Sequence, residues 1–380
     1  MANKRNIFIV TGEASGDLHA AKLVKDVHKL DPSITFSGMG GINMQKAGVN
    51  IIIDFTNLAA MGLFDVLRHL TKFYSARKII YKTLTNDPPD LLILIDFSGF
   101  NLRLVKKAKQ AGIKILYYIT PQVWASRQRR VKTMRKYIDQ LAVIFPFEVN
   151  FYKQFDMPVT FVGHPLANTV HATMDKDFAK QKFALNSEYK TIGLFPGSRK
   201  GEIKRLLPVM LESAELLKET FPNMQFILAL ASSLTKQDLD PYLKKSNLDI
   251  KIVENQNYDA MQVCDAIIAT SGTVTLEIAL MNIPMVIIYK ISPPYFPIKL
   301  IINVPFIGLC NIIAGKEIVK EFLQQHANPK NVSAEITHIL ADANYRNNMI
   351  TELKKIKPQL SLKETANLAQ LILKMLHKLQ

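Results

Sequence analysis

The apolar run at residues 91–95 (LLILI) is the sequence feature that most constrains the fold. It stands between the sequence DPPD on its N-terminal side and Asp96 on its C-terminal side. A short uninterrupted apolar run is typical of a strand in a parallel sheet, because both faces of that strand are buried. Ligands of open parallel sheets bind outside the carboxyl ends of the strands. Asp96 is therefore expected either at the mouth of a binding site or, more simply, as the cap of a helix that opens at Asn101.

Strand-like runs alternate with helical stretches along most of the chain. They lie at residues 5–11, 34–38, 49–53, 91–95, 113–119, 141–145 and 159–162, and again at 191–195, 225–230, 250–253, 266–269 and 285–289. This alternation predicts an α/β protein whose parallel sheets carry helices on both faces. A chain of 380 residues is longer than one core usually supports. We therefore predict two Rossmann-like domains in tandem, joined near residues 163–190.

The net charge of +16 is the strongest clue in the composition. Such a charge favours polyanions, anionic membrane surfaces or phosphorylated substrates. The densest basic run begins at Arg127, but no zinc-finger, basic-zipper or RNA-recognition signature accompanies it, so nucleic acid is not favoured. Two cysteines and no secretory leader suggest a reducing cytoplasm. We find no metal-ligand spacing of His, Cys or Asp, and no apolar run long enough to span a membrane.

Three glycine-containing turns follow predicted strands and could receive an anion. Residues 12–17 (GEASGD) follow the first strand, where either an anion-binding helix start or a plain tight turn fits the pattern. Gly197, Ser198 and Arg199 combine a turn with free amides and a guanidinium group suited to phosphate. The turn from Ser271 to Thr273 would present amides and hydroxyls to a diphosphate, with Glu277 one helical turn further in to hold ribose hydroxyls. The last two turns indicate a bound nucleotide-sugar or, alternatively, two unrelated glycine turns.

Residues 61–74 have the pattern of an amphipathic helix with a basic margin. Such a face usually packs on the sheet, and the alternative is a face that lies on a bilayer surface or covers acyl chains. The apolar residues that carry the pattern are Leu63, Phe64, Val66, Leu67, Leu70 and Phe73.

Seven motifs, in this order, resemble those of lipid-A-disaccharide synthase over nearly the whole chain. They are GEASGD at 12–17, ID…FN at 95–101, PQVWA at 121–125, GHP at 163–165, PGSR at 196–199, SGT at 271–273 and NIIAG at 311–315. The resemblance implies a GT-B fold, in which two Rossmann-like domains face a central cleft, and an inverting glycosyltransferase that needs no metal or other cofactor. That family joins UDP-2,3-diacylglucosamine to 2,3-diacylglucosamine 1-phosphate (lipid X) through a β-1,6 bond, releasing UDP. The reaction belongs to lipid A and lipopolysaccharide biosynthesis of Gram-negative bacteria, on the cytoplasmic face of the inner membrane.

The resemblance also implies roles for individual residues. Asp96 would be the general base for the acceptor's 6-hydroxyl, with Glu13 as a second catalytic candidate. The UDP site would comprise Gly197, Ser198, Arg199, Ser271, Gly272, Thr273, Glu277 and Asn311. The acceptor would contact Ser15, Gly16, Asp17, Asn101, Trp124 and Arg127, with its 1-phosphate near Arg127. The helix at 61–74 matches a membrane-facing, acyl-accommodating segment, which favours the surface interpretation of that helix.

The family pattern extends to domains and partners. It implies an acceptor and membrane-facing domain at 1–165 and a UDP-donor domain at 166–359. It allows a C-terminal helix at about 360–380 to pack back on the first domain, and a homodimer that exchanges C-terminal segments. An anionic inner-membrane surface is the expected further partner. The family commonly has Pro-Asp where this chain has Ser98 and Gly99, which concentrates the base role on Asp96.

Two other functions remain open on sequence alone. A soluble UDP-N-acetylglucosamine 2-epimerase of the same fold would use no lipid and would need no apolar helix at residues 61–74. A non-catalytic basic module that binds lipid or RNA would not depend on Asp96 for its function.

Overall fold

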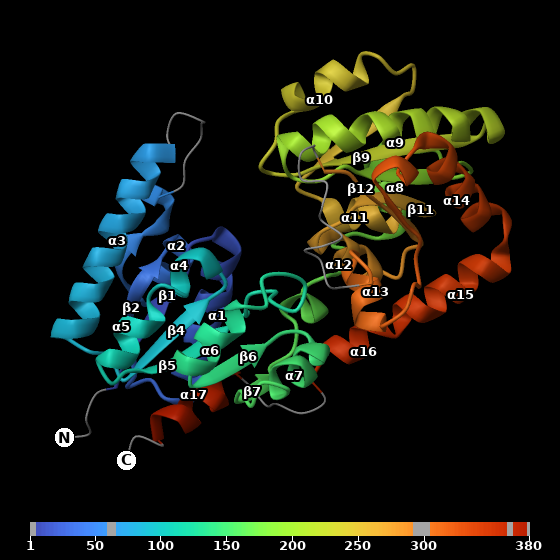
Figure 1. Cartoon of the computed structure of the whole chain (residues 1–380). Coiled ribbons are helices and arrows are strands. Elements are labelled where there is room, and N and C mark those ends of the chain that lie inside the picture. The colour runs from blue at the N-terminus through green and yellow to red at the C-terminus, as the bar shows by residue number, and fades with distance from the viewer. Residues whose placement is uncertain (1–4, 59–65, 292–304, 363–367, 378–380) are drawn as a thin grey trace. The chain divides into compact units, whose positions relative to one another are not determined.

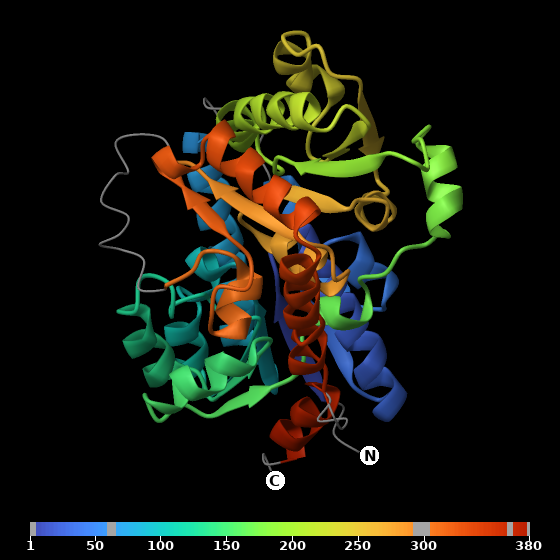
Figure 2. The same ribbon diagram turned by 90° about the vertical axis from the view of Figure 1, so that its right-hand side faces the viewer.

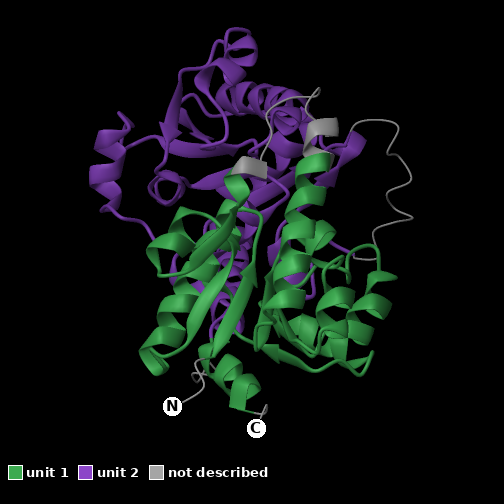
Figure 3. Ribbon diagram, turned by 90° about the vertical axis from the view of Figure 1, so that its left-hand side faces the viewer, with its two compact units in different colours: residues 1–165, 362–380 green, residues 166–361 purple. Residues whose placement is uncertain are grey.

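The computed structural model describes residues 5–58, 66–291, 305–362 and 368–377, without the side chains of residues 57, 58 and 66–70. The chain forms two compact units (Figure 3). Unit 1 comprises Met1–Pro165 together with Leu362–Gln380, and unit 2 comprises Leu166–Ser361. The C-terminal segment therefore belongs to the unit in which the chain begins, although unit 2 intervenes in the sequence.

The described part of unit 1 is built on a seven-stranded parallel sheet with the strand order β3-β2-β1-β4-β5-β6-β7 (Figure 1). Its strands are β1 (Asn6–Val10), β2 (Thr35–Gly40), β3 (Asn50–Asp54), β4 (Leu91–Ile95), β5 (Lys114–Tyr118), β6 (Gln140–Val143) and β7 (Val159–Phe161). All five residues of β4 are buried, which confirms the central strand expected at residues 91–95. The strand order reverses between β1 and β4, so a topological switch point lies beside Asp96.

Helices connect these strands and cover the sheet. They are α1 (Ala14–Leu30), α2 (Ile42–Lys46), α3 (Val66–Asn86), α4 (Ser98–Asn101), α5 (Val105–Gln110), α6 (Arg130–Tyr137), α7 (Pro146–Lys153) and α17 (Leu368–His377). One core cluster joins Ala76, Ile80 and Leu84 of α3 to Phe8 and Leu92 of the sheet. The spacing of these α3 residues is that of one helix face, so this part of α3 is a core-packed helix. The terminal helix α17 packs against α1, and Lys114 Nζ lies 3.5 Å from the carbonyl oxygen of Met375.

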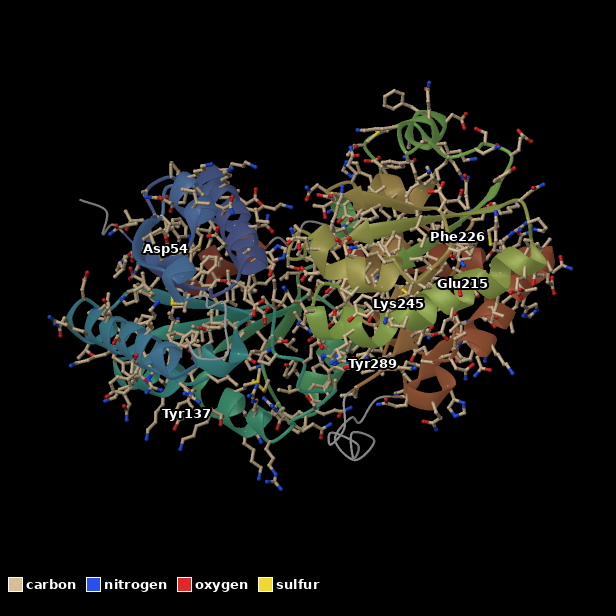
Figure 4. All side chains as sticks on the ribbon, turned by 90° about the horizontal axis from the view of Figure 1, so that it is seen from above. Asp54, Tyr137, Glu215, Phe226, Lys245 and Tyr289 are labelled. Atoms are coloured by element: carbon tan, nitrogen blue, oxygen red, sulfur yellow. The ribbon has the colours of Figure 1, made fainter. Side chains whose placement is uncertain are left out.

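Unit 2 contains a six-stranded parallel sheet within the described residues (Figure 2). Its order is β10-β9-β8-β11-β12-β13, which reverses between β8 and β11. The strands are β8 (Lys190–Phe195), β9 (Met224–Leu230), β10 (Ile250–Glu254), β11 (Ala266–Thr270), β12 (Met285–Tyr289) and β13 (Glu321–Leu323). Phe226 of β9, labelled in Figure 4, is 2% exposed and is among the largest buried side chains.

The helices of unit 2 likewise alternate with its strands along most of its sequence. They are α8 (Lys176–Lys182), α9 (Lys200–Thr220), α10 (Lys236–Leu243), α11 (Asn257–Gln262), α12 (Thr273–Leu280), α13 (Leu309–Ala314), α14 (Pro329–Ala341), α15 (Ala343–Lys354) and α16 (Ile356–Leu360). Helices α9 and α14 pack against each other and against β11. Helix α12 packs against β11 and α13, which fixes the turn that starts at Ser271.

Both sheets therefore confirm the α/β class that the sequence predicts. The sequence pattern does not predict the edge strand β13, because three residues are too few for a period to be recognised. Within the described residues, no helix has the length and apolar character needed to cross a bilayer.

Candidate active site

The ends of β1 and β4 meet at the switch point of the unit 1 sheet. Val10 of β1 pairs with Leu94 of β4, so the motif at residues 12–17 and Asp96 leave the sheet at the same edge. The contact is close, because a Cβ atom on Gly12 would lie 2.5 Å from the ring of Phe97. A side chain at position 12 would displace that ring, which explains why glycine occupies this position.

The backbone that presents Asp96 is strained. Asp96 and Phe97 both have φ values of 44°, a left-handed conformation that non-glycine residues seldom adopt twice in succession. Hydrogen bonds to the Asp96 backbone hold the turn. The Asp96 amide donates to the Tyr118 carbonyl (3.2 Å), while the Asp96 carbonyl accepts from the Tyr117 hydroxyl (2.6 Å) and from Asn101 Nδ2 (2.9 Å). Strain that is held in this way fixes the direction of the side chain.

The Asp96 carboxyl group has the electrostatics that a general base needs. Burial raises its pKa above the ordinary aspartate value, and a hydrogen bond from the Phe97 amide offsets part of that rise. A carboxylate with a raised pKa binds a proton more strongly. Nearby, Arg130 Nη1 donates to Ser98 Oγ (3.1 Å), which brings a guanidinium group to the Asp96 turn. The basic run at residues 127–136 signals positive charge there, but the sequence does not show which arginine reaches the turn.

Glu13 and Ser15 are exposed at the start of α1. Gly16 is buried against Thr11, since a Cβ atom there would lie 2.0 Å from Thr11 Oγ1. Asp17 is 2% exposed, and its carboxylate accepts bonds from Gly41 N (2.7 Å), Asn43 N (3.0 Å), Asn43 Nδ2 (2.8 Å) and Met44 N (3.2 Å). Those bonds hold the start of α2, so this carboxylate supports the fold of the β2–α2 connection.

Two further residues predicted to contact the acceptor are buried. Asn101 is fully buried, and its side-chain amide nitrogen donates to the carbonyls of Ile95 and Asp96. Trp124 is 6% exposed, and its indole nitrogen donates to Glu148 Oε1 (3.2 Å). Arg127 is exposed and has a φ value of 57°. Of these three, only Arg127 presents its side chain to solvent.

Glu148, which lies outside the seven sequence motifs, organises the loop that carries Trp124. The Thr120 hydroxyl (3.1 Å), the Trp124 indole and the Phe145 amide (3.1 Å) all donate to its carboxylate. Burial raises the pKa of Glu148 to about 7. The sequence signal was present, because proline followed two residues later by glutamate is typical of the first turn of a helix.

The structure describes only part of the apolar helix predicted at residues 61–74. Leu63 and Phe64 lie outside the described residues, and the side chains of Val66, Leu67 and Leu70 are likewise outside the description. Phe73 is half-buried, with its ring centroid 5.9 Å from that of Phe97 and 6.1 Å from that of Phe100. Its contact is therefore with the Asp96 turn.

In unit 2, the two predicted phosphate turns also meet at the switch point, after β8 and β11. The φ value of Gly197 is 107°, which favours glycine. The amides of Ser198 (2.9 Å) and Arg199 (3.3 Å) both donate to Glu202 Oε2. The amides that the sequence predicts to be free are thus already bonded in this structure. The Arg199 side chain is 82% exposed, and its Nη1 atom lies 3.1 Å from Glu202 Oε1.

The second turn keeps exposed backbone at the start of α12. Gly272 and Thr273 are exposed, whereas Ser271 donates through its hydroxyl to the Ile307 carbonyl (2.9 Å). Glu277 is half-buried and accepts a bond from the Tyr258 hydroxyl (2.9 Å). Burial raises the pKa of Glu277, and the bond from Tyr258 partly opposes that rise. Tyr258 on α11 and Glu277 on α12 are 19 residues apart, and no local pattern predicts their contact.

Asn311 is fully buried and is hydrogen-bonded to residues near β13. Its Nδ2 atom donates to Val319 O (2.8 Å) and Glu321 Oε1 (2.7 Å), while its Oδ1 atom accepts from the Ile318 and Val319 amides. Glu321 in turn accepts from the Ile307 amide (2.8 Å), and Ile307 receives the Ser271 hydroxyl. Asn311 is connected to the Ser271 turn through this chain of bonds. Among the described residues, no cluster of His, Cys, Asp and Glu could hold a metal ion.

Known proteins resemble this chain in both sequence and fold. A family model described as lipid-A-disaccharide synthetase matches residues 7–375. The lipid-A-disaccharide synthase of Geobacter metallireducens is 49% identical over 94% of this chain and 93% of that protein. That of Coxiella burnetii (strain CbuG_Q212) is 40% identical over 100% of this chain and 99% of that protein.

Solved structures with low sequence identity share the fold. A UDP-GlcNAc 2-epimerase from Neisseria meningitidis bound to UDP-GlcNAc has a TM-score of 0.60 at 13% identity, covering 98% of this chain and 100% of that one. A glycosyltransferase from Rickettsia africae has a TM-score of 0.59 at 13% identity, covering 99% and 98%. These likenesses support the GT-B fold, and at such identity they do not favour the epimerase alternative. The match over residues 7–375 and the relatives at 40–49% identity show that this chain belongs to the lipid-A-disaccharide synthase family.

Proposed function

We propose that Asp96 is the general base of a lipid-A-disaccharide synthase reaction in this chain. The substrates are UDP-2,3-diacylglucosamine as donor and 2,3-diacylglucosamine 1-phosphate as acceptor. The observation that carries the proposal is the position of Asp96, on a strained turn at the switch point of the unit 1 sheet, with a pKa raised by burial. A base so placed is held in one direction and binds the substrate proton more strongly than an exposed aspartate.

We propose that unit 2 holds the UDP group at its own switch point. Arg199 supplies an exposed guanidinium group for the diphosphate. The exposed backbone at Gly272 and Thr273 lies at the start of α12, where amide groups and the helix dipole favour an anion. Glu277, held by Tyr258, would accept the ribose hydroxyls. Asn311 would act as a positioning residue, because its bonds reach the Ser271 turn only through Glu321 and Ile307.

The reaction follows as a single displacement at the anomeric carbon of the donor. Asp96 removes the proton of the acceptor's 6-hydroxyl, and the oxygen forms a bond to that carbon from the face opposite UDP. The bond between the anomeric carbon and the diphosphate oxygen breaks, and UDP leaves with the electron pair. One such displacement inverts the configuration. Arg199 and the amides at the α12 start would stabilise the negative charge that develops on the leaving group.

We further propose that unit 1 associates with the cytoplasmic face of the inner membrane. The net charge of +16 favours an anionic leaflet. Helix α3 offers both elements of such a surface, since Tyr74 is 62% exposed, Ile79 is 46% exposed, and Lys78 and Lys82 are exposed on the same helix. This arrangement gives apolar contact together with positive charge.

A homodimer that exchanges C-terminal segments is also proposed. In the sequence, the whole of unit 2 stands between helix α17 and the rest of unit 1. The helix packs on α1, and Leu368, Ile372 and Leu376 are buried on its strongly apolar face. The α17 of a second copy could make the same contacts. Sedimentation of the full chain at several concentrations tests this, and a monomer throughout the range would contradict it.

Turnover of the two lipid substrates tests the proposed function. Purified protein in uncharged detergent should release UDP from UDP-2,3-diacylglucosamine only when the acceptor is present, with one disaccharide 1-phosphate formed for each UDP. Release without acceptor would indicate hydrolysis. Turnover of UDP-N-acetylglucosamine in the absence of any lipid would instead support the epimerase alternative.

A further inference from the structure

An apolar pocket of about 450 Å³ lies between α3 and the turn that follows Asp96. Its apolar lining includes Phe73 of α3 together with Phe97 and Phe100. The rings of Phe97 and Phe100 stack with their centroids 5.3 Å apart, and Phe73 packs against both. The volume falls within the roughly 300–1,000 Å³ that is usual for small-molecule sites. The pocket is therefore large enough for part of a ligand and is mostly apolar.

Two arginines also line this pocket, Arg77 on α3 and Arg103 between α4 and α5. Tyr81 contacts both residues. The guanidinium carbon of Arg77 lies 6.0 Å from the centroid of the Tyr81 ring, and the Tyr81 hydroxyl donates to the backbone carbonyl of Arg103 (2.7 Å). Neither arginine forms an ion pair with a carboxylate in the part of the chain that the structure describes, and the lining residues include no acidic side chain. The pocket thus combines aromatic walls with two positive charges suited to an anion.

The acceptor has the same combination of groups next to its reacting hydroxyl. Its C6 hydroxymethyl group and its 1-phosphate are attached to the two carbons that flank the ring oxygen. The acyl group on C2 is attached to the carbon beside the one that bears the phosphate. A base that reaches the 6-hydroxyl therefore has an anion close by, followed by a hydrocarbon chain.

We propose that Arg77 and Arg103 bind the acceptor's 1-phosphate and that the phenylalanine pocket receives the beginning of the acyl chain on C2. This inference rests on the proposed role of Asp96, which precedes the pocket residue Phe97 in the chain. Arginine presents a planar set of donors that matches phosphate oxygens. Burial of acyl methylene groups against the three rings adds apolar contact in the same pocket.

This assignment differs from the sequence prediction, which placed the phosphate near Arg127. Arg127 is exposed and does not line the pocket, whereas Arg77 and Arg103 do. Arg77 lies in the middle of α3 and Arg103 lies beyond α4. Because the two arginines are far apart in the sequence, only the folded structure shows that they line the same pocket.

Kinetics with two acceptors test the phosphate site. The enzyme is assayed in uncharged detergent micelles with 2,3-diacylglucosamine 1-phosphate and with 2,3-diacylglucosamine that lacks the phosphate. Arg77→Gln and Arg103→Gln should each raise the KM for the phosphorylated acceptor about 10-fold to 100-fold, the usual effect of losing a charge-assisted bond. The KM for the unphosphorylated acceptor and for the donor should change less than threefold.

Lys106→Gln and Lys107→Gln are matched controls, because both residues are exposed on the neighbouring α5 and lie outside the pocket. They should leave the KM for both acceptors within twofold. Equal losses on both acceptors, or equal losses in the lysine controls, would overturn the proposal. A phosphate-specific loss in Arg127→Gln with none in the two pocket arginines would restore the original assignment and also overturn it.

Filling the pocket tests the acyl part separately. A Cβ atom on Gly99, which lines the pocket, would meet no atom within 4 Å, so a side chain can leave the backbone there without a clash at its first atom. Gly99→Leu should leave the thermal unfolding temperature within about 2 °C and raise the KM for long-chain acceptors at least tenfold. Gly99→Ala should give a smaller rise, and acceptors with short acyl chains should be affected less. An unchanged KM for the long-chain acceptor in Gly99→Leu would contradict the assignment.

Binding without turnover separates this inference from the role of Asp96. Calorimetric titration of Asp96→Asn with the phosphorylated acceptor in micelles should show nearly wild-type affinity, and adding Arg77→Gln should weaken it at least tenfold. If Asp96→Asn were fully active and the arginine variant still lost phosphate-dependent binding, the pocket would stand and the base would lie elsewhere. If Asp96→Asn were inactive and Arg77→Gln bound the acceptor normally, the base would stand and the pocket assignment would fail.

Discussion

Gly12 and Phe97 are in such close contact that a Cβ atom on Gly12 would lie 2.5 Å from the Phe97 ring. Gly12 follows β1 and Phe97 follows β4, the two strands between which the order of the unit 1 sheet reverses. The contact fixes the height of the Asp96 turn above the sheet. Because Phe97 also lines the phenylalanine pocket between α3 and the Asp96 turn, one contact affects both the base and the proposed acceptor site.

Gly12→Ala should therefore impair both stability and activity. Overpacking of this kind typically costs about 1–3 kcal/mol, and denaturant titration should show a loss of that size. We expect kcat to fall as well, because the displaced Phe97 ring moves the adjacent Asp96. Gly12→Ala combined with Phe97→Leu should regain most of the lost stability, since leucine leaves room for the new methyl group. If Gly12→Ala were as stable and as active as wild type, the contact would not position Asp96.

Glu148 should give the protein a pH-dependent stability. Its pKa is about 7 in the folded protein and 4.5 as an unperturbed group, so the folded state binds its proton more tightly. The free energy of unfolding should then fall as the pH rises from about 4.5 to about 7 and should not change further above that, by up to about 3 kcal/mol. Glu148→Gln cannot titrate and should lack this component. Denaturant titrations of both proteins at pH 5 and pH 8 measure it, and equal pH dependence would contradict the assignment.

Tyr258→Phe should weaken donor binding without affecting the acceptor. The variant removes the hydroxyl that donates to Glu277 Oε1, and with it the bond that opposes the rise in the Glu277 pKa. Glu277 then loses both its orientation and part of its preference for the ionised form. We expect the KM for the UDP-sugar to rise about 5-fold to 20-fold, the usual effect of one lost hydrogen bond. A change in acceptor KM of the same size would show that the effect is not confined to the donor site.

Membrane association should depend on salt and on the charge of α3. Binding to vesicles that contain anionic lipid should decrease between 0.05 and about 0.5 M salt, because exposed charges are increasingly screened. Lys78→Gln combined with Lys82→Gln should weaken binding about tenfold or more. Lys244→Gln combined with Lys245→Gln removes the same charge from exposed residues of unit 2 and should have a much smaller effect. Equal effects of the two pairs would show that net charge alone drives binding.

The sequence predicts the order of the strands other than β13, because strands such as residues 91–95 are apolar throughout and are followed by turns that contain glycine. It also placed Asp96 at a strand end, where a parallel sheet binds ligands. The resemblance supplied the chemistry. The switch points between β1 and β4 and between β8 and β11 then bring the predicted motifs of each unit to one edge of its sheet.

The sequence could not show which polar side chains would be buried and hydrogen-bonded inside the protein. Asp17, Asn101, Trp124 and Asn311 have the residue types of ligand contacts, yet they are buried and hydrogen-bonded inside the protein. Burial depends on partners far along the chain, such as Glu148 for Trp124, which is 24 residues away. For the same reason the pairing of Arg77 with Arg103 had no local signal.

The most direct test of the account is the rate of acceptor-dependent UDP release by Asp96→Asn. Asparagine has nearly the same shape as aspartate and accepts no proton, so substrate binding should persist while kcat falls by about 10²-fold to 10⁴-fold, the usual contribution of a general base. The acid limb of the wild-type kcat/KM profile should lie above the ordinary aspartate pKa, in line with the burial of this carboxyl group. Release within tenfold of the wild-type rate would contradict Asp96 as the base and would make Glu13 the next residue to test.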